Sequence, residues 1–452
     1  MKALFLLHQF LPRHVTGTEQ YARSVARELI RRGNEVEIFA FEPLIQFEAP
    51  PDTAWFARSE SVDGIPVQRI SLHPDTSPNP PLADYENPIA GRLFARHLAA
   101  GGFDLVHVFH ARNVGTDAIA APRALGVPVV VNLMDFWFLC PNFMLLRRNG
   151  DLCQGPPEGG LGCVPCMDPA LAATVAGAGT AQQLRAVGEG NDVLAGMRRT
   201  PAAYAHALIA RKARLFAALA RADAIVAPSR FLQRMFEDAG FPRGRITHVA
   251  YGVDESRLAN ARGEREPRAP GAPLRIGYVG SITPHKGLHV LVRALRRVPG
   301  DGWRLAVHGA LETHPEYTAR IRRLAGTDSR IRFHGSFAPD ALGVVLRSLD
   351  VVVVPSLWYE NTPFSILEAL AAGVPVVASD LGGISEVVEH GGNGWLFAAG
   401  DRAALTGRLA ALVADPAQLD ALRPAPLRSL TANVDDFAAI YRRLLGSRAA
   451  VR

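Results

Sequence analysis

The strongest constraint in this sequence is a strand–helix alternation that runs twice, once on each side of a charged, proline-rich segment. Short apolar runs are followed by stretches with helical periodicity, which predicts parallel sheets covered by helices on both faces. Residues 258–273, LANARGEREPRAPGAP, are poor in apolar side chains and predict a linker. We therefore expect an α/β protein with two doubly wound, Rossmann-like domains facing a central cleft, at residues 1–257 and 274–430.

The individual elements follow from the same periodicities. The expected strands are 3–7, 36–41, 105–109, 127–133 and 224–227, then 275–279, 304–308, 331–334, 350–355 and 374–379. The expected helices are 19–32, 288–297, 315–325, 341–348, 363–372 and 384–389. The Ala- and Gly-rich stretch of about 167–200 predicts a partly helical insertion, and 431–452 predicts a C-terminal helix that packs back on the first domain.

Composition excludes several classes of protein. The 452 residues are 48% apolar, which is incompatible with a largely disordered chain. The net charge of +6 is spread evenly, without the basic runs and interleaved aromatic residues of a nucleic-acid binder. No apolar run has the length of a membrane span, and the first residues read as a strand rather than a signal peptide, so we expect a cytoplasmic protein.

One helical segment leaves a membrane contact open. Residues 205–221, AHALIARKARLFAALAR, are basic and amphipathic. Such a helix can lie at the cytoplasmic face of an anionic membrane. The other interpretation is an ordinary surface helix packed on its own domain.

Four cysteines lie close together in the sequence. Cys140, Cys153, Cys163 and Cys166 have the spacing C-x12-C-x9-C-x2-C, within a loop rich in turn residues. In a cytosolic protein this clustering favours a metal site over disulfides. A structural Zn²⁺ held by four thiolates is the leading hypothesis, and the alternatives are an iron–sulfur cluster and thiols that are unligated or reversibly oxidised.

The turns that follow the strands of the second half are rich in groups suited to an anion. No G-x-G-x-x-G follows any strand, which argues against an ordinary NAD or FAD domain. The first turn, 280–287, contains Lys286. The chain has only three lysines, and the other two are Lys2 and Lys212. A compact ammonium before a helix can reach phosphate oxygens, although a solvated lysine at a helix entry is the alternative.

The second and third turns share this character. In the second, Thr362 is expected as the N-cap and Pro363 as the first residue of a helix, whose N-terminal amides favour a phosphate. The third is Gly-rich, around Gly383. Glu360 and Glu368 bracket the second helix start with the spacing E-x7-E, and carboxylates beside a phosphate site need a hydroxyl or a cation to contact.

Together these motifs resemble a known family. The second half contains the segments GSITPHKG, VVVVPS, ENTPFSILEALAAGVPVVAS, GGISE and NGWLF. The first half contains TGTEQYARSVARELIRRGNEVEIF, FDLVHVFH, MDFWFLCP, APSRFL and YGVD. These segments are similar to those of retaining GT-B glycosyltransferases of family 4 (group 1). Within that family the chain resembles a subgroup with a Cys-containing insertion, about 140–166, after DFWFLCP.

The resemblance implies an activity and its partners. It implies transfer of a sugar from a nucleotide-diphosphate sugar, UDP- or GDP-linked, to a glycan or lipid-linked saccharide in cell-surface polysaccharide biosynthesis. The anomeric configuration would be retained and no catalytic metal would be required.

The resemblance also implies roles for individual residues. Lys286 would contact the donor diphosphate, Glu360 the transferred sugar and Glu368 the ribose. The remaining donor-binding positions are Gly17, Ser281, Asn361, Thr362, Pro363, Phe364 and Gly383.

The chain departs from the family at two positions. A second basic residue is common where this chain has Ser281, and His usually stands where it has Met134. A thioether cannot hydrogen-bond strongly to a sugar hydroxyl, so either His110 covers that task, or the donor pocket differs, or activity is reduced. His110 and Asp135 are catalytic candidates, and the alternatives are a plain strand-end histidine and a structural cap. The alternative function is a non-catalytic homologue that only binds a sugar nucleotide.

Overall fold

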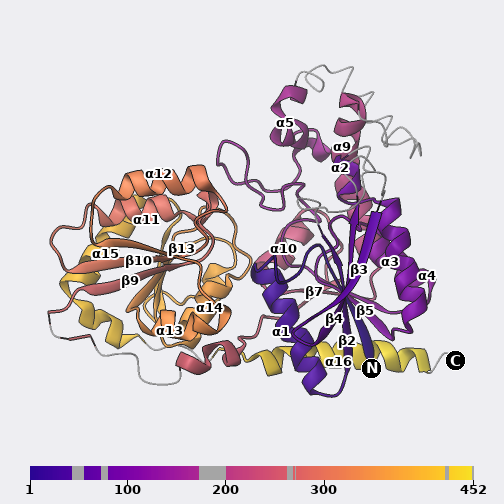
Figure 1. Ribbon diagram of the computed structural model, residues 1–452. Helices are drawn as coiled ribbons and strands as arrows, with labels where there is room; N and C mark the ends of the chain where they lie inside the picture. The colour runs from indigo at the N-terminus through magenta and orange to yellow at the C-terminus, as the bar shows by residue number, and fades with distance from the viewer. Residues whose placement is uncertain are drawn as a thin grey trace. The chain divides into compact units, whose positions relative to one another are not determined.

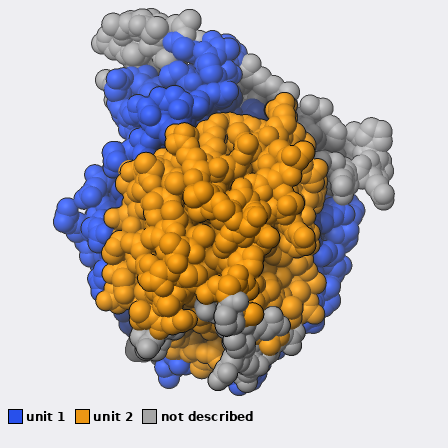
Figure 2. All heavy atoms as spheres, turned by 90° about the vertical axis from the view of Figure 1, so that its left-hand side faces the viewer, with its two compact units in different colours: residues 1–250, 434–452 blue, residues 251–433 orange. Residues whose placement is uncertain are grey.

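A computed structural model describes the chain over residues 1–42, 55–72, 80–172, 200–261, 268–269, 271–422 and 427–449. The chain divides into two compact units, which Figure 2 colours separately. The first unit comprises residues 1–250 and 434–452, and the second comprises residues 251–433.

The first unit is built on an eight-stranded sheet with the strand order β3-β4-β2-β1-β5-β6-β7-β8. The strands are β1 (Lys2–Leu7), β2 (Glu35–Phe41), β3 (Trp55–Val62), β4 (Ile65–Leu72), β5 (Leu105–Val108), β6 (Val129–Asn132), β7 (Ala224–Ala227) and β8 (Ile246–His248). All neighbouring pairs are parallel except β3 and β4. The central strand β1 is buried from Ala3 to Leu7, as expected for a sheet covered on both faces.

Helices connect the parallel strands of this unit (Figure 1). They are α1 (Gly17–Arg31), α2 (Pro80–Ala83), α3 (Pro88–Gly101), α4 (Asp117–Ala124), α9 (Pro201–Leu219) and α10 (Arg230–Asp238). Three short turns follow β6: η2 (Pro157–Gly160), α5 (Cys163–Met167) and η3 (Pro169–Leu171). Most of the helical insertion expected at 167–200 lies outside the described residues, which resume at residue 200.

The last helix, α16 (Leu430–Ala449), belongs to the first unit from Val434 onward. His107 Nδ1 on β5 lies 2.6 Å from the Tyr441 hydroxyl, and both side chains are buried. Arg32, which follows the last residue of α1, forms an ion pair with Asp435 of this helix at 2.7 Å. The helix is therefore fixed by one buried polar contact and one exposed ion pair.

The second unit has a six-stranded parallel sheet with the order β11-β10-β9-β12-β13-β14. Its strands are β9 (Leu274–Val279), β10 (Trp303–His308), β11 (Ile331–Gly335), β12 (Val351–Val354), β13 (Val376–Asp380) and β14 (Gly394–Ala398). Its helices are α11 (Leu288–Leu295), α12 (Pro315–Ala325), α13 (Leu342–Arg347), α14 (Phe364–Ala371) and α15 (Arg402–Ala414), with short 3-10 turns η4 (Glu255–Ala261), η5 (Pro284–Lys286), η6 (Pro339–Ala341), η7 (Ile384–Glu386) and η8 (Pro416–Ala421).

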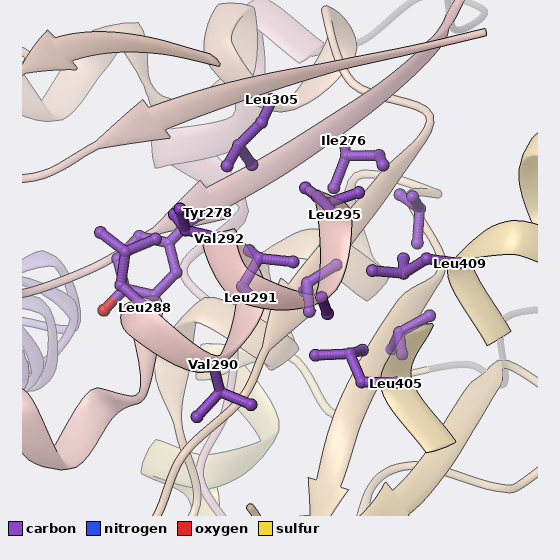
Figure 3. Packing of buried hydrophobic residues seen from close by; sticks show 14 of the residues in the cluster. Ile276, Tyr278, Leu288, Val290, Leu291, Val292, Leu295, Leu305, Leu405 and Leu409 are labelled. Carbon is purple, nitrogen blue, oxygen red and sulfur yellow. The ribbon is translucent and has the colours of Figure 1, made fainter. Parts of the chain in front are cut away.

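The core of the second unit lies between the sheet and the helices α11 and α15. Leu291 and Leu295 of α11 pack beside Ile276 of β9, with Leu405 and Leu409 of α15 close to them (Figure 3). These side chains are fully buried. Their apolar area, removed from water at about 25 cal/mol per Å², holds the strand ends, and hence the turns that follow them, in place.

The α/β class and the two doubly wound sheets are confirmed, but several elements differ from expectation. The helix predicted at 384–389 is wrong, because only the 3-10 turn η7 forms there. Strands β3, β4, β8 and β14 were not predicted. None of the described helices has the length and hydropathy of a membrane-spanning segment.

Candidate functional site

Three turns meet at the carboxyl ends of β9, β12 and β13, which are neighbours in the second sheet. The Leu357 amide donates to the His285 carbonyl at 2.8 Å, and the Gly383 amide donates to the Glu360 carbonyl at 2.7 Å. Gly287 adopts φ +73°, and a Cβ there would lie 1.8 Å from the Pro355 carbonyl oxygen. A larger residue at Gly287 would therefore push the first turn away from the second.

Lys286 and Glu360 form the polar centre of these turns. The Lys286 ammonium donates to Glu360 Oε1 at 2.7 Å. The same oxygen accepts the Ser356 hydroxyl at 2.6 Å and the Trp358 indole N–H at 2.9 Å. Lys286 Nζ also lies 5.0 Å from the Trp358 ring centre, a cation–π distance. The two residues that the sequence singles out are thus brought into direct contact.

The Glu360 carboxyl is ionised in this setting. Burial opposes its ionisation, since the side chain is 5% exposed, but the Lys286 charge and three donated hydrogen bonds outweigh burial and lower its pKa below the usual value. The pKa of neighbouring His285 is lowered as well, which in a histidine favours the neutral form. Burial, helped by the Lys286 charge, lowers the pKa of His285 to about 4, so its ring is neutral at pH 7.

The second turn leads into α14, but not with the expected cap. The helix begins at Phe364, and Pro363 occupies the N-cap position without a side-chain cap bond. The assignments of Thr362 as N-cap and Pro363 as first helical residue are therefore wrong by one position, although Thr362 is buried in the turn. A proline cap offers no side-chain acceptor, so the first amides of α14, after Asn361 and Pro363, are suited to an external anion.

Glu368, in the second turn of α14, has a partner that the sequence did not reveal. Arg257 Nη1 of η4 donates to Glu368 Oε1 at 2.5 Å. Burial raises the pKa of the Glu368 carboxyl, and the Arg257 charge opposes that rise. Arg257 lies three residues after the end of the YGVD segment, and this nearness to a family motif was the one signal that could have identified it.

Three further predicted donor-binding positions, Ser281, Gly383 and Phe364, lie in these turns or at the start of α14. Ser281 is exposed, and its carbonyl accepts the Tyr278 hydroxyl at 2.7 Å. Gly383 is buried and precedes η7. Phe364 stacks on Tyr251 with ring centres 4.7 Å apart, which fixes the start of α14.

In the first unit, Gly17 is the exposed first residue of α1. Next to it, the Thr16 hydroxyl donates to Glu19 Oε2 at 2.5 Å, and the Gln9 amide donates to Glu19 Oε1 at 3.0 Å. Glu19 is fully buried. The glycine turn is therefore held by a buried carboxylate at the N-terminus of the helix, where the helix dipole favours negative charge.

His110 and Asp135, which follow β5 and β6, also lie together. The His110 Nδ1 accepts the Arg112 amide at 3.2 Å, so its Nε2 carries the proton and donates to Asp135 Oδ2 at 3.2 Å. His8, after β1, was not predicted, yet its ring centre is 4.0 Å from that of His110. Burial lowers the pKa of His8 well below its usual value. Its position directly after a buried strand was the available signal.

The four cysteines gather in the segment after β6. Cys140, Cys153 and Cys163 are buried and Cys166 is partly buried, all as free thiols. Burial raises the pKa of Cys140 to about 11 and that of Cys163 to about 12, and the other three thiols act on Cys163 in the same direction. Across the described ranges, no three His, Cys, Asp or Glu side chains stand ready to hold a metal ion. The zinc site stays a prediction.

The basic helix at 205–221 corresponds to α9, and its charges are used within the unit. Arg211 donates to Asp84 at 3.1 Å, Arg214 to Glu86 at 2.6 Å, and Lys212 to the Ala239 carbonyl at 3.1 Å. These contacts favour the interpretation of a helix packed on its own domain. Membrane contact stays a prediction.

Comparison with known families decides the chain's relationship. A model described as "Glycosyl transferase 4-like domain" matches residues 16–252, and one described as "Glycosyl transferases group 1" matches residues 273–415. The first of these models matches more than half of the chain, which therefore belongs to the family of the glycosyl transferase 4-like domain. The match to residues 273–415 includes Lys286, Glu360 and Glu368. The match to residues 16–252 includes His110 and all four cysteines.

Curated relatives agree with the family. D-inositol 3-phosphate glycosyltransferase of Nocardia farcinica is 34% identical over 226 residues, which cover 47% of this chain and 49% of the relative. The putative colanic acid biosynthesis glycosyltransferase WcaL of Escherichia coli K12 is 32% identical over 204 residues, covering 43% and 47%. This glycosyltransferase thus spans about half the length of the curated relatives it matches.

Solved structures show the fold. Sucrose-phosphate synthase from Thermosynechococcus elongatus has a TM-score of 0.64 at 18% identity and covers 99% of each chain. Anabaena HepE in complex with UDP-glucose has a TM-score of 0.59 at 18% identity and covers 100% of each chain. The GT-B fold of this glycosyltransferase is therefore confirmed.

Proposed function

We propose that this chain is a retaining glycosyltransferase of family 4 that moves a sugar from a nucleotide-diphosphate sugar to a glycan or lipid-linked saccharide. The observation that carries the proposal is the Lys286–Glu360 pair, 2.7 Å apart, beside the N-terminus of α14. The named activities of the relatives and the UDP and ADP bound by several structural neighbours support a nucleotide-sugar donor. The colanic acid relatives support a place in cell-surface polysaccharide biosynthesis.

The residues of the second unit would stabilise the leaving group. As the C1–O bond to the diphosphate breaks, negative charge grows on the phosphate oxygens. Lys286, with donors left beyond the one given to Glu360, and the first amides of α14 are positioned to receive that charge. The acceptor oxygen bonds to C1 on the same face, and its proton leaves with the diphosphate, so the configuration is retained.

Glu360 would serve two purposes in this scheme. Its carboxylate holds the Lys286 ammonium in place before the donor arrives, and it faces the transferred sugar afterwards. Three hydrogen bonds to Oε1 fix its orientation, so little rearrangement is needed when charge develops. Glu368 would bind ribose hydroxyls, with Arg257 keeping the carboxylate charged and oriented.

His110 and Asp135 are proposed to act on the acceptor side of the reaction. Asp135 Oδ2 accepts a hydrogen bond from His110 Nε2–H, and Asp135 Oδ1 accepts one from the Trp137 amide at 2.7 Å. This arrangement supplies a carboxylate whose geometry is set by two donors. It provides hydrogen-bonding capacity that Met134 lacks.

A panel of nucleotide sugars tests the proposal. UDP-, GDP- and ADP-linked sugars are added to the whole chain and the unfolding temperature is measured, because a ligand that binds only the folded state raises it. We expect one nucleotide series to stabilise the protein and to release its nucleoside diphosphate in a turnover assay. Stabilisation without release would favour the non-catalytic binder, and no stabilisation by any member would contradict the proposal.

A further inference from the structure

Arg211 is a buried cation with donors that no described group satisfies. Its side chain, on α9, is 2% exposed. Only Nη2 has a hydrogen-bond partner, Asp84 Oδ2 at 3.1 Å, while Nε and Nη1 are buried without one. An unmet buried donor on a charged group is costly, so a residue kept in this state requires an explanation.

The environment of these donors includes two of the cysteines. The Arg211 charge acts on the thiols of both Cys140 and Cys163. Both residues are buried, as is Cys153, and Cys166 is partly buried. The unsatisfied guanidinium and the thiols of Cys140 and Cys163 therefore belong to one buried cluster.

The backbone around this cluster is closely packed. Gly160 of η2 adopts φ +102°, and a Cβ there would lie 3.0 Å from the Ile209 Cα of α9. Val164, between Cys163 and Cys166, packs with Ala205 and Leu208 of the same helix. Figure 1 shows α5 beside α9 in the first unit. The segment that carries the cysteines is thus seated on the helix that carries Arg211.

The segment has few apolar side chains of its own to hold it together. Among the described residues, the buried apolar cluster where the segment meets α9 comprises Val164, Ala205 and Leu208, and Leu145 and Leu161 are also buried. A hairpin-like turn joins Leu146 to Leu152, and the Cys153 amide donates to the Leu145 carbonyl at 2.8 Å. A lobe this small commonly needs a disulfide or a metal to stay ordered.

We propose that Cys140, Cys153, Cys163 and Cys166 bind one structural Zn²⁺ as thiolates, and that Arg211 is its buried counter-charge. Four thiols would release four protons on binding the ion, which leaves a centre of net charge −2. The free Nε and Nη1 donors of Arg211 are suited to hydrogen-bond to thiolate sulfur and to reduce that charge. Zinc accepts four thiolates in a closed tetrahedral shell, so no position would remain for substrate.

The protonated state of the thiols explains why no group of three metal-binding side chains is assembled among the described residues. Cys140 Sγ–H donates to Asn142 Oδ1 at 2.8 Å, and Cys153 Sγ–H donates to the Gly155 carbonyl at 2.9 Å. Both bonds require the proton on sulfur. Loss of that proton breaks the hydrogen bond from each sulfur to its oxygen, so each sulfur could then rotate towards the ion.

The centre would also be connected to the His110–Asp135 pair. Asp84 Oδ2 accepts from Arg211 and from the Trp137 indole N–H at 2.9 Å. The Trp137 amide in turn donates to Asp135. The ion would therefore set the position of Arg211, Asp84 and Trp137, and through them the geometry of the Asp135 carboxylate.

The test begins with the metal content of the whole chain purified without chelator. Elemental analysis is expected to give one zinc per chain, and cobalt(II) in place of zinc is expected to give the visible bands of a tetrahedral thiolate site. Cys166→Ser is expected to lose both, and because Cys166 is only partly buried this variant is the most tolerant of substitution. An iron–sulfur chromophore, a disulfide, or four titratable thiols that do not take up added zinc would overturn the proposal.

A second measurement isolates the role of Arg211. Zinc affinity is measured by competition with a chromogenic chelator for Arg211→Met and Arg211→Lys, with Arg214→Met as the matched control on the same helix. We expect Arg211→Met to weaken zinc binding by about 10- to 100-fold, as loss of an outer contact usually does, and Arg211→Lys to recover part of it. Equal affinities in the Arg211→Met and Arg214→Met variants, with both folded by circular dichroism, would remove Arg211 from the site.

Discussion

Among single residues, Lys286 and Glu360 are central to the proposed site because each stabilises the other. The carboxylate is buried and the ammonium is about one quarter exposed, with side-chain exposures of 5% and 26%. Without its partner, the Glu360 carboxylate would be an uncompensated buried charge, and Lys286 would lose the contact that holds it in the turn. Stability and function are therefore coupled at this pair.

Replacing Lys286 should reveal that coupling. Lys286→Met is expected to lower the free energy of unfolding by about 2–3 kcal/mol at pH 7.5, since breaking a buried pair costs about 3–5 kcal/mol and Lys286 is partly exposed. Urea unfolding measures this, and Lys212→Met is the control. The double variant Lys286→Met with Glu360→Gln should regain most of the stability and none of the turnover. A double variant no more stable than Lys286→Met alone would show that the pair is not the cause.

The two glutamates should separate turnover from nucleotide binding. Glu360→Gln is expected to lower turnover by about 10²-fold or more while leaving the affinity for the nucleoside diphosphate within a few-fold. Glu368→Gln is expected to weaken that affinity by about 10-fold, because free nucleotide keeps the ribose. Isothermal titration and turnover assays measure the two effects. A large affinity loss for Glu360→Gln with none for Glu368→Gln would reverse the assigned roles.

At the scale of elements, the contact between β5 and α16 makes the fold sensitive to acid. Burial lowers the pKa of His107 from 6.5 to about 3, and its Nε2 is buried without a partner. The unfolded chain therefore binds this proton at a higher pH than the folded chain does. The His107 contribution to stability is complete above about pH 6.5 and declines as the pH falls from there towards about 3.

Removing that contact should flatten the pH dependence. The double replacement His107→Phe with Tyr441→Phe eliminates the buried titratable ring together with its hydroxyl partner. The unfolding temperature of this variant is expected to fall less between pH 7 and pH 5 than that of the original chain. His314→Phe, at an exposed position, is the control. If the variant and the original chain show the same decline, His107 does not set the acid sensitivity.

The elements differ in how far they could be predicted from sequence. Central strands such as β1 and β12 are continuous apolar runs, because both of their faces are buried. The antiparallel hairpin of β3 and β4 was missed because β3 is largely exposed and lacks such a run, although its Asp63-Gly64 turn is a hairpin signal. The helix expected at 384–389 stops after one 3-10 turn, which the β-branched residues Val387 and Val388 follow, and such residues have a low helix propensity.

The candidate site shows the same division. Lys286 and Glu360 were identifiable because charged residues at strand-end turns are chemically conspicuous, and Glu368 was identifiable from its E-x7-E spacing to Glu360. Their partners were not, because Arg257 lies 111 residues from Glu368 in the sequence and no local pattern joins them. His8 and Arg211 were missed for a related reason: their meaning depends on burial and on unmet hydrogen bonds, which only the folded chain reveals.

In the whole molecule, the two units have separate sheets, and the proposed donor contacts other than Gly17 fall in the second unit. Lys286, Glu360, Arg257 and Glu368 belong to residues 251–433. Binding of a nucleoside diphosphate should therefore be reported first by the second unit, through amides in the turns 280–287, 355–363 and 381–386.

Hydrogen exchange with and without the nucleoside diphosphate tests whether the nucleotide binds to the second unit. Slower exchange is expected in those three turns and in the first turn of α14, because ordered ligand contacts reduce local opening. The segment of the first unit that carries the cysteines is expected to exchange at an unchanged rate. Protection confined to the first unit would place the nucleotide elsewhere and contradict the donor assignment.

The most direct test of the central claim is the rate at which the chain releases nucleoside diphosphate from its stabilising nucleotide sugar. The rate is measured at saturating donor for the original chain, Lys286→Met and Lys212→Met. We expect measurable release by the original chain, a loss of about 10²-fold or more in Lys286→Met, and an unchanged rate in Lys212→Met. Equal rates in the two lysine variants would contradict the claim that the Lys286–Glu360 pair is the centre of a glycosyl transfer site.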